Sequence, residues 1–155
     1  MSQSLKNNSN LEDYHREYVI ERNDIANAGT VASLTKRALK KRGLSREFVK
    51  TVTIGVYEAE INVVIHSYGG KVTVDIDNEA IEITFKDTGP GIQDIELAKT
   101  AGYSTASSYA IENGFGAGMG LPNIIAVSYE MKLESSEEGT NLYIRFDLKD
   151  EYYEN

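Results

Sequence analysis

A carboxylate, a carboxamide and two glycine-rich turns are the residues of this chain that are best suited to chemistry. Glu58 and Asn62 stand four positions apart, and the turns span 87–91 (Asp-Thr-Gly-Pro-Gly) and 114–120 (Gly-Phe-Gly-Ala-Gly-Met-Gly). Glycine lets backbone N–H groups approach a ligand closely, so its clusters mark turns or phosphate-binding loops. A carboxylate can accept a proton, and a carboxamide oxygen is a neutral ligand for a hard cation. Together these residues predict a nucleotide site.

The familiar nucleotide-binding fingerprints do not match these turns. A dinucleotide fold requires G-x-G-x-x-G, but the sixth residue counted from Gly114 is Met119, and the count from the next glycine also fails. A P-loop requires Gly-Lys followed by Ser or Thr, whereas the Gly-Lys pair at 70–71 is followed by Val72. The H-R-D and D-F-G signatures of protein kinases are absent from the sequence. The sequence therefore disfavours these three folds.

Length and composition indicate one compact domain inside the cell. A chain of 155 residues can bury a real hydrophobic core. The absence of cysteine excludes disulfides and thiolate metal sites, and His15 and His66 are too few for a zinc site. No apolar run reaches the roughly 18 residues that span a bilayer, and the first residues lack the apolar core of a signal peptide. We expect a cytoplasmic protein with no membrane partner.

The charge balance opposes nucleic acid as the main partner. The formal net charge is −8, whereas phosphate neutralisation needs clustered lysines and arginines. The one basic cluster runs from Lys36-Arg37 to Lys40-Lys41-Arg42. We interpret it as the end of a helix, where cations complement the helix dipole.

Hydrophobic spacing predicts the order β-α-α-β-β-α-loop-α-β-β. Strands are expected at 15–21, 72–77, 81–86, 132–136 and 142–148, helices at 27–42, 45–66, 94–101 and 122–128, and a loop at 102–118. Ser45 is expected to cap the second helix, with Glu47 as its capping partner. The order predicts an α/β sandwich (α+β), a mixed, mainly antiparallel sheet with helices packed on one face. We expect a flexible N-terminus at 1–12, a single domain at 13–150 and a tail at 151–155.

The helix at 45–66 carries a polar line beside its apolar stripe. The stripe consists of residues spaced at helical period, namely Val52, Val56, Ala59 and Val63. Glu58, Asn62 and His66 form the second line, one helical turn apart. Polar groups at the edge of a buried face need partners, which a metal-bound phosphate can supply. Ordinary polar decoration of a helix is the alternative, and Glu60, which points away from the line, is expected to be structural or on the surface.

Asp87 ends a predicted strand and begins the first glycine turn. A buried carboxylate at this place could accept a hydrogen bond from an amine such as the adenine N6 group. The alternative is an aspartate that starts a turn and bonds its own backbone, which is common.

Four motifs in order resemble those of the GHKL (gyrase, Hsp90, histidine kinase, MutL) ATPase superfamily. They are Glu58-Ala-Glu-Ile-Asn62 with Val-Val-Ile-His66, Asp87-Thr-Gly-Pro-Gly-Ile92, Gly116-Ala-Gly-Met-Gly-Leu121 and Gly139-Thr140. The similarity covers roughly residues 45–148 and implies a histidine-kinase-like ATPase domain with a Bergerat-type ATP-binding fold. Within the superfamily, the short chain resembles the anti-sigma factors and switch-protein serine kinases.

The resemblance implies a role for each matching residue. Asn62 would bind Mg²⁺, Glu58 would act as general base, and Asp87 would hold the adenine amine of ATP, helped through water by Thr140. The remaining nucleotide-binding residues would be His66, Gly89, Gly91, Ile92, Ser104, Thr105, Gly116, Gly118, Met119, Gly120 and Leu121. Residues 102–118 would form the ATP lid. No Lys or Arg lies between Lys99 and Lys132, although some relatives place a lid cation on the terminal phosphate.

The resemblance leaves three functions open. The first is a protein serine/threonine kinase that phosphorylates a STAS-type anti-sigma antagonist. The second is an ATP-dependent binding switch, an anti-sigma factor that holds a sigma factor or similar regulator with little catalysis. The third is an ATPase fragment whose other domains are missing, which the complete order of elements disfavours. Whether the chain forms a homodimer is left open.

Overall fold

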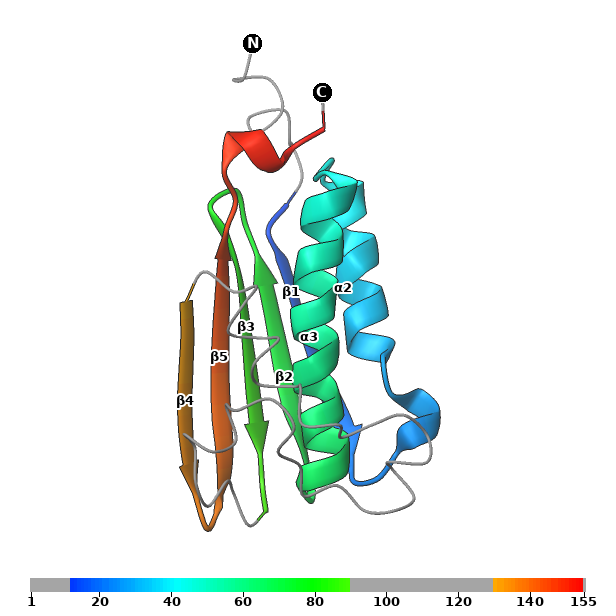
Figure 1. The fold of residues 1–155 in the computed structure, drawn as a ribbon, viewed down its shortest axis with the longest axis vertical. Helices are drawn as coiled ribbons and strands as arrows, with labels where there is room; N and C mark the ends of the chain where they lie inside the picture. Colours follow the sequence, from blue (N-terminus) through cyan, green and yellow to red (C-terminus); the bar gives the residue numbers. More distant parts are fainter. Residues whose placement is uncertain (1–11, 90–129, 155) are drawn as a thin grey trace.

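A five-stranded sheet carries two helices on one of its faces (Figure 1). The computed structural model describes residues 12–89 and 130–154. Its elements are β1 (Tyr14–Glu21), α2 (Thr30–Lys41), α3 (Arg46–His66), β2 (Gly69–Ile76), β3 (Ala80–Asp87), β4 (Glu130–Ser136) and β5 (Gly139–Asp147), with short 3₁₀ turns η1 (Ile25–Asn27) and η2 (Asp150–Tyr152). The strand order is β1-β2-β3-β5-β4. The expected α+β fold with helices on one face is confirmed.

The sheet differs from the expectation in strand direction and in two strand starts. All four pairings are antiparallel, so the described sheet is not mixed. β2 begins at Gly69 and β5 at Gly139, each three residues earlier than predicted. The sequence suggests that Gly70 is a turn residue, but Gly70 pairs with Asp87 in the β2–β3 ladder. A Cβ at Gly70 would lie 2.4 Å from the carbonyl oxygen of Lys86, so the strand needs glycine there. The expected helices at 94–101 and 122–128 and the loop at 102–118 lie outside the described residues.

Ser45 caps the start of helix α3 as expected, but its backbone N–H binds Tyr152 and not the predicted partner Glu47. The Ser45 side chain accepts a hydrogen bond from the backbone N–H of Phe48 at 3.2 Å. The backbone N–H of Ser45 donates to the carbonyl oxygen of Tyr152 at 2.6 Å. The predicted pairing with Glu47 is therefore wrong, because a capping box needs its acid at the third helical position, which Phe48 occupies.

The core lies between the sheet and helix α3. Val52 and Val56 of α3 are 0% exposed, and the predicted stripe residues Ala59 and Val63 are also buried. The facing strand residues are Val72, Val74, Ile76, Ile81, Ile83, Phe85, Leu142, Ile144 and Phe146. Full burial of one such side chain contributes about 1.5–3 kcal/mol, so this layer fixes where α3 sits on the sheet. No helix of the described residues has the length and apolar content that a membrane span needs.

Glu60 joins the two helices. Its side chain is 2% exposed and accepts hydrogen bonds from the backbone N–H groups of Gly29, Val31 and Ala32 at 3.0–3.1 Å. These are donors at the start of α2 that have no partner within the helix. Burial raises the pKa of Glu60, and the backbone hydrogen bonds oppose that rise. Of the two expectations for Glu60, the structural one is right and the surface one is wrong.

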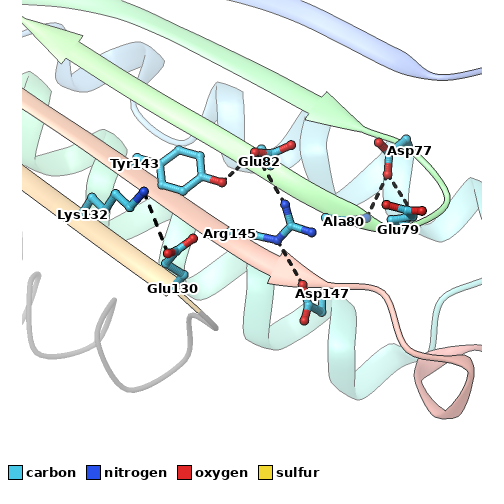
Figure 2. Close-up of polar contacts among 9 residues, drawn as sticks. All are labelled: Asp77, Glu79, Ala80, Glu82, Glu130, Lys132, Tyr143, Arg145 and Asp147. Carbon is cyan, nitrogen blue, oxygen red and sulfur yellow. Dashed lines mark hydrogen bonds and ion pairs between the residues drawn. The ribbon is translucent and has the colours of Figure 1, made fainter.

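The sheet face away from the helices is polar (Figure 2). Glu82 accepts a hydrogen bond from the Tyr143 hydroxyl at 2.6 Å and lies 3.8 Å from the Arg145 guanidinium. Arg145 also donates to Asp147 at 3.0 Å. At the β2–β3 turn, the Asp77 side chain accepts hydrogen bonds from the backbone N–H groups of Glu79 and Ala80. These contacts connect neighbouring strands without apolar cover, so one sheet face forms the core and the other faces solvent.

Candidate nucleotide site

Three segments that carry predicted site residues meet at one end of the sheet (Figure 1). They are the end of α3, the end of β3 and the turn between β4 and β5. The backbone N–H of Tyr68 donates to the carbonyl oxygen of Thr88 at 2.7 Å, which attaches the end of α3 to the end of β3. The N–H of Gly89 donates to the carbonyl oxygen of Glu138 at 3.3 Å, which attaches the same segment to the β4–β5 turn. The structure thus joins the residues that follow α3 to the segments 87–89 and 138–140.

Asp87 is half-buried at the centre of this junction. Its Oδ1 atom accepts the backbone N–H of Thr140 at 2.9 Å. Among the described residues, no hydrogen bond reaches its Oδ2 atom. Burial raises the pKa of the Asp87 carboxyl, and the Thr140 hydrogen bond opposes that rise. Within the described part of its turn, residues 87–89, the aspartate side chain makes no hydrogen bond, and its Oδ2 atom is an acceptor that a ligand amine could fill.

Two glycines allow the close approach of the segments around Asp87. Gly89 has φ +149°, and a Cβ there would lie 3.2 Å from the Cα atom of Ser67. Gly139 has φ +148°, and a Cβ there would lie 2.0 Å from the carbonyl oxygen of Asp87. The positive φ disfavours other residues at both positions, and at Gly139 the neighbouring backbone also leaves no room for a Cβ. Gly89 was predicted as a site residue, and here it brings the strand end against the helix end.

The predicted polar line of α3 is present on its second half. Glu58, Asn62 and His66 are all partly exposed, beside the buried Ala59 and Val63. Among the described residues, the Asn62 side chain has no hydrogen-bond partner, so its oxygen is available to a ligand. Burial lowers the pKa of His66, so its imidazole is neutral at neutral pH. The arrangement supplies a carboxylate, a carboxamide and a neutral imidazole along one line.

The described carboxylates and imidazoles do not by themselves form a metal site at this line. Among residues 12–89 and 130–154, no three His, Cys, Asp or Glu side chains are placed to hold an ion together. Mg²⁺ commonly keeps several waters and uses one or two protein ligands together with substrate phosphates. The Asn62 carboxamide fits that kind of site.

Several predicted site residues fall outside the part of the chain that the structure describes. They are Gly91, Ile92, Ser104, Thr105, Gly116, Gly118, Met119, Gly120 and Leu121. The structure also adds residues that the sequence reading did not include. Ser67 ends α3 by donating to the Val63 carbonyl oxygen at 2.6 Å and accepting the Gly69 N–H at 3.0 Å. The Gly69-Gly70 pair was the available signal for this junction, but it was read only as a helix end.

Thr140 contacts the site through its backbone and a neighbouring hydroxyl. Its N–H binds Asp87, and its Oγ1 lies 2.8 Å from the Ser135 Oγ. The structure thus places Thr140 directly beside Asp87. The direct backbone bond differs from the water-mediated adenine contact that the resemblance implied, which stays a prediction.

Comparisons with known proteins agree with this geometry. The family model described as "Histidine kinase-like ATPase domain" matches residues 22–146. The chain is 31% identical over 110 residues to a protein of Clostridium novyi (strain NT) named "Anti-sigma F factor", covering 66% of this chain and 73% of that relative. The fold is similar to a crystal structure of the RsbU and RsbW domains of Rv1364c from Mycobacterium tuberculosis, with a TM-score of 0.57 and 15% identity, over 87% of this chain and 32% of that one.

The family model covers most of the chain, including every described residue of the candidate site. The relative above 30% identity is an anti-sigma factor by name, and the structural similarity supports the same fold. This protein belongs to the histidine kinase-like ATPase family and is related within it to the anti-sigma factors.

Proposed function

We propose that this protein is an ATP- and Mg²⁺-dependent serine/threonine kinase that phosphorylates a STAS-type anti-sigma antagonist. Family membership already implies ATP binding. The observation that carries the proposal is the junction of three segments, the C-terminal end of α3, the end of β3 with Asp87, and the β4–β5 turn with Thr140. Helix α3 carries Glu58, Asn62 and His66 on its second half, so the proposed general base, metal ligand and adenine acceptor belong to elements that are joined at this end of the sheet. In this proposal residues 13–150 act as a single ATP-binding domain.

Asp87 selects the base. Its open Oδ2 atom would accept the N6 amine of adenine, while Thr140 holds Oδ1. Guanine presents a carbonyl oxygen at the equivalent position, which would repel a carboxylate. A mismatched buried polar group costs about 1–3 kcal/mol, so the site should prefer ATP over GTP.

Glu58 and Asn62 divide the chemistry. A Mg²⁺ ion bound through Asn62 would neutralise phosphate charge and fix the terminal phosphate. The hydroxyl oxygen of a partner serine or threonine would form a bond to the γ-phosphorus as the bond to the departing ADP oxygen breaks. Glu58 would accept the proton of that hydroxyl. His66, neutral because it is buried, would add no positive charge to the site.

The alternative is a binding switch that turns over little ATP. Two observations favour it: the named relative is an anti-sigma factor, and no Lys or Arg lies between Lys99 and Lys132 to stabilise transferred charge. Phosphoryl transfer rests largely on positioning and charge stabilisation, so a missing cation bears on rate more than on binding.

Intact mass spectrometry separates the two functions. The full chain is incubated with Mg·ATP and purified STAS-type candidate partners, and a gain of about 80 Da on a partner, the mass of one phosphoryl group, demonstrates transfer. ATP-dependent complex formation without a mass gain would replace the kinase by the binding switch.

A further inference from the structure

The positive charge of this acidic protein is concentrated in one short segment. Residues 36–50 hold seven of the 16 lysines and arginines but only one of the 24 aspartates and glutamates, Glu47. This segment forms the second half of α2, the connection to α3 and the first turn and a half of α3. The family's site residues lie elsewhere, so the proposed function does not account for this charge.

Six of the seven side chains are exposed on the second half of α2 and the start of α3, and we call these six residues the basic surface. Its residues are Lys36, Arg37, Lys40, Lys41, Arg46 and Lys50. The seventh, Arg42, is 9% exposed and donates to the carbonyl oxygen of Glu12 and to Asn78, so it belongs to the structure of the domain. The two helices pack side by side, and the basic surface lies at the end opposite the nucleotide site (Figure 1).

The cations of the basic surface have no acidic partners among the described residues. The ion pairs of that part of the chain involve His15, Lys132 and Arg145, two of which lie on the solvent face of the sheet shown in Figure 2. Lys132 and Arg145 on the sheet face therefore have acidic partners. The charge of the basic surface is left to solvent.

Helix stability does not explain this arrangement. Lys40 and Lys41 lie in the last turn of α2, where the helix dipole favours cations, as the sequence indicated. Arg46, in contrast, is the first residue of α3, where the dipole disfavours a cation. Like charges one turn apart, such as Arg46 and Lys50, also destabilise a helix slightly. Arg46 thus lies where the helix dipole disfavours a cation, and within the described part of the chain none of the six cations forms an ion pair, which points to a contact outside the domain.

We propose that the basic surface docks an acidic face of a partner protein. Ile54, 38% exposed, lies one helical turn beyond Lys50 and gives the surface an apolar residue beside its cations, as protein interfaces have. A bilayer would need an apolar helix face, but Val31 and Leu39 of α2 are buried in the core. Nucleic acid would meet the repulsion of the overall charge of −8.

The test measures binding of a short fluorescein-labelled poly-glutamate peptide to the full chain by fluorescence anisotropy, at low and at physiological salt. We expect Lys36→Glu combined with Lys50→Glu to weaken binding at least about tenfold, because both cations face the acidic probe. The matched control is Lys71→Glu combined with Lys86→Glu, an exposed cross-strand pair on the sheet face that changes net charge equally. The control should weaken binding only about twofold.

Three results would overturn the proposal. Equal losses in both variants would mean that only net charge matters. The other two are that the chain binds a DNA duplex, or phosphatidylglycerol vesicles, more tightly than the peptide. If that binding were lost when Lys36→Glu is combined with Lys50→Glu, the basic surface would be assigned to nucleic acid or to membrane. Melting temperatures show whether each double variant is folded. If the Lys→Glu variants unfold, the same comparison is made with the neutral double variants Lys36→Gln/Lys50→Gln and Lys71→Gln/Lys86→Gln. None of these outcomes depends on phosphoryl transfer, so the proposed function is tested separately.

Discussion

Asp87 stands at the end of β3 with one carboxylate oxygen bound to the Thr140 N–H and the other open among the described residues. A sequence can suggest that a strand-ending aspartate has a function, but it cannot identify a hydrogen-bond donor 53 positions away. The motif resemblance placed the two residues in one site, and the antiparallel pairing of β3 with β5 is the physical reason that they meet.

The base preference is the first prediction at the scale of single residues. Asp87→Asn replaces an acceptor by a group that also carries donors, so ATP affinity should fall about ten- to hundredfold and the preference over GTP should shrink. The Asn oxygen can keep the Thr140 bond, so the fold should persist. Calorimetry with both nucleotides checks this, with the exposed Asp150→Asn as control. Equal affinities of the parent for ATP and GTP would refute the assignment of Asp87.

Asn62 gives a second prediction at this scale. Asn62→Ala removes the proposed magnesium ligand, so ATP affinity measured with Mg²⁺ should fall, while affinity measured with EDTA should change little. Because Asn62 is only partly buried and has no described hydrogen bond, the melting temperature should stay near that of the parent. An unchanged affinity for Mg·ATP would remove Asn62 from the metal site.

The elements themselves were largely predictable, and their ends were not. Periodic apolar residues identified all described strands and both long helices, because burial selects one face of each element. The glycines misled at Gly70 and Gly139, since they lie in strands where close backbone contact requires them. The link between α2 and α3 was missed because it depends on Glu60, whose partners at 29–32 are distant in sequence.

Glu60 gives the stability prediction for the helix pair. Glu60→Ala should lower the free energy of unfolding by about 1–3 kcal/mol or more, because buried N–H groups at the start of α2 lose their acceptor. Chemical denaturation monitored by circular dichroism measures the change. The exposed Glu47→Ala serves as the control and should stay within about 0.5 kcal/mol of the parent. A negligible effect of Glu60→Ala would show that α2 is held by packing alone.

The edge strand gives a prediction on pH. His15 of β1 pairs with Asp75 of β2, which raises the pKa of His15, while burial lowers that of His66. NMR titration should therefore find one histidine above 6.5 and the other below it. Because the folded pKa of His15 is raised, its contribution to stability is present below pH 6.5 and lost as the pH rises through the folded value. Asp75→Asn should lower only the higher value; a shift of both would contradict the pairing.

On the scale of the whole molecule, the chain separates two kinds of surface. The candidate nucleotide site lies at the His66 end of α3, and the basic surface lies toward the Arg46 end. Net charge alone indicated an acidic protein with no nucleic-acid partner, but only the structure shows that six cations are exposed on neighbouring helices without described acidic partners. If the proposed partner docks at the Arg46 end of α3, the candidate nucleotide site at the other end stays accessible.

Phosphoryl transfer by the Glu58→Ala variant tests the kinase assignment most directly. The rate of phosphate transfer from Mg·ATP to a partner that the parent phosphorylates is followed by intact mass, together with Mg·ATP affinity and melting temperature. Loss of the general base should slow transfer by about 10²–10⁴-fold while affinity and stability remain near those of the parent. Transfer at the parental rate would contradict the proposed mechanism, because Glu58 would then not be the base.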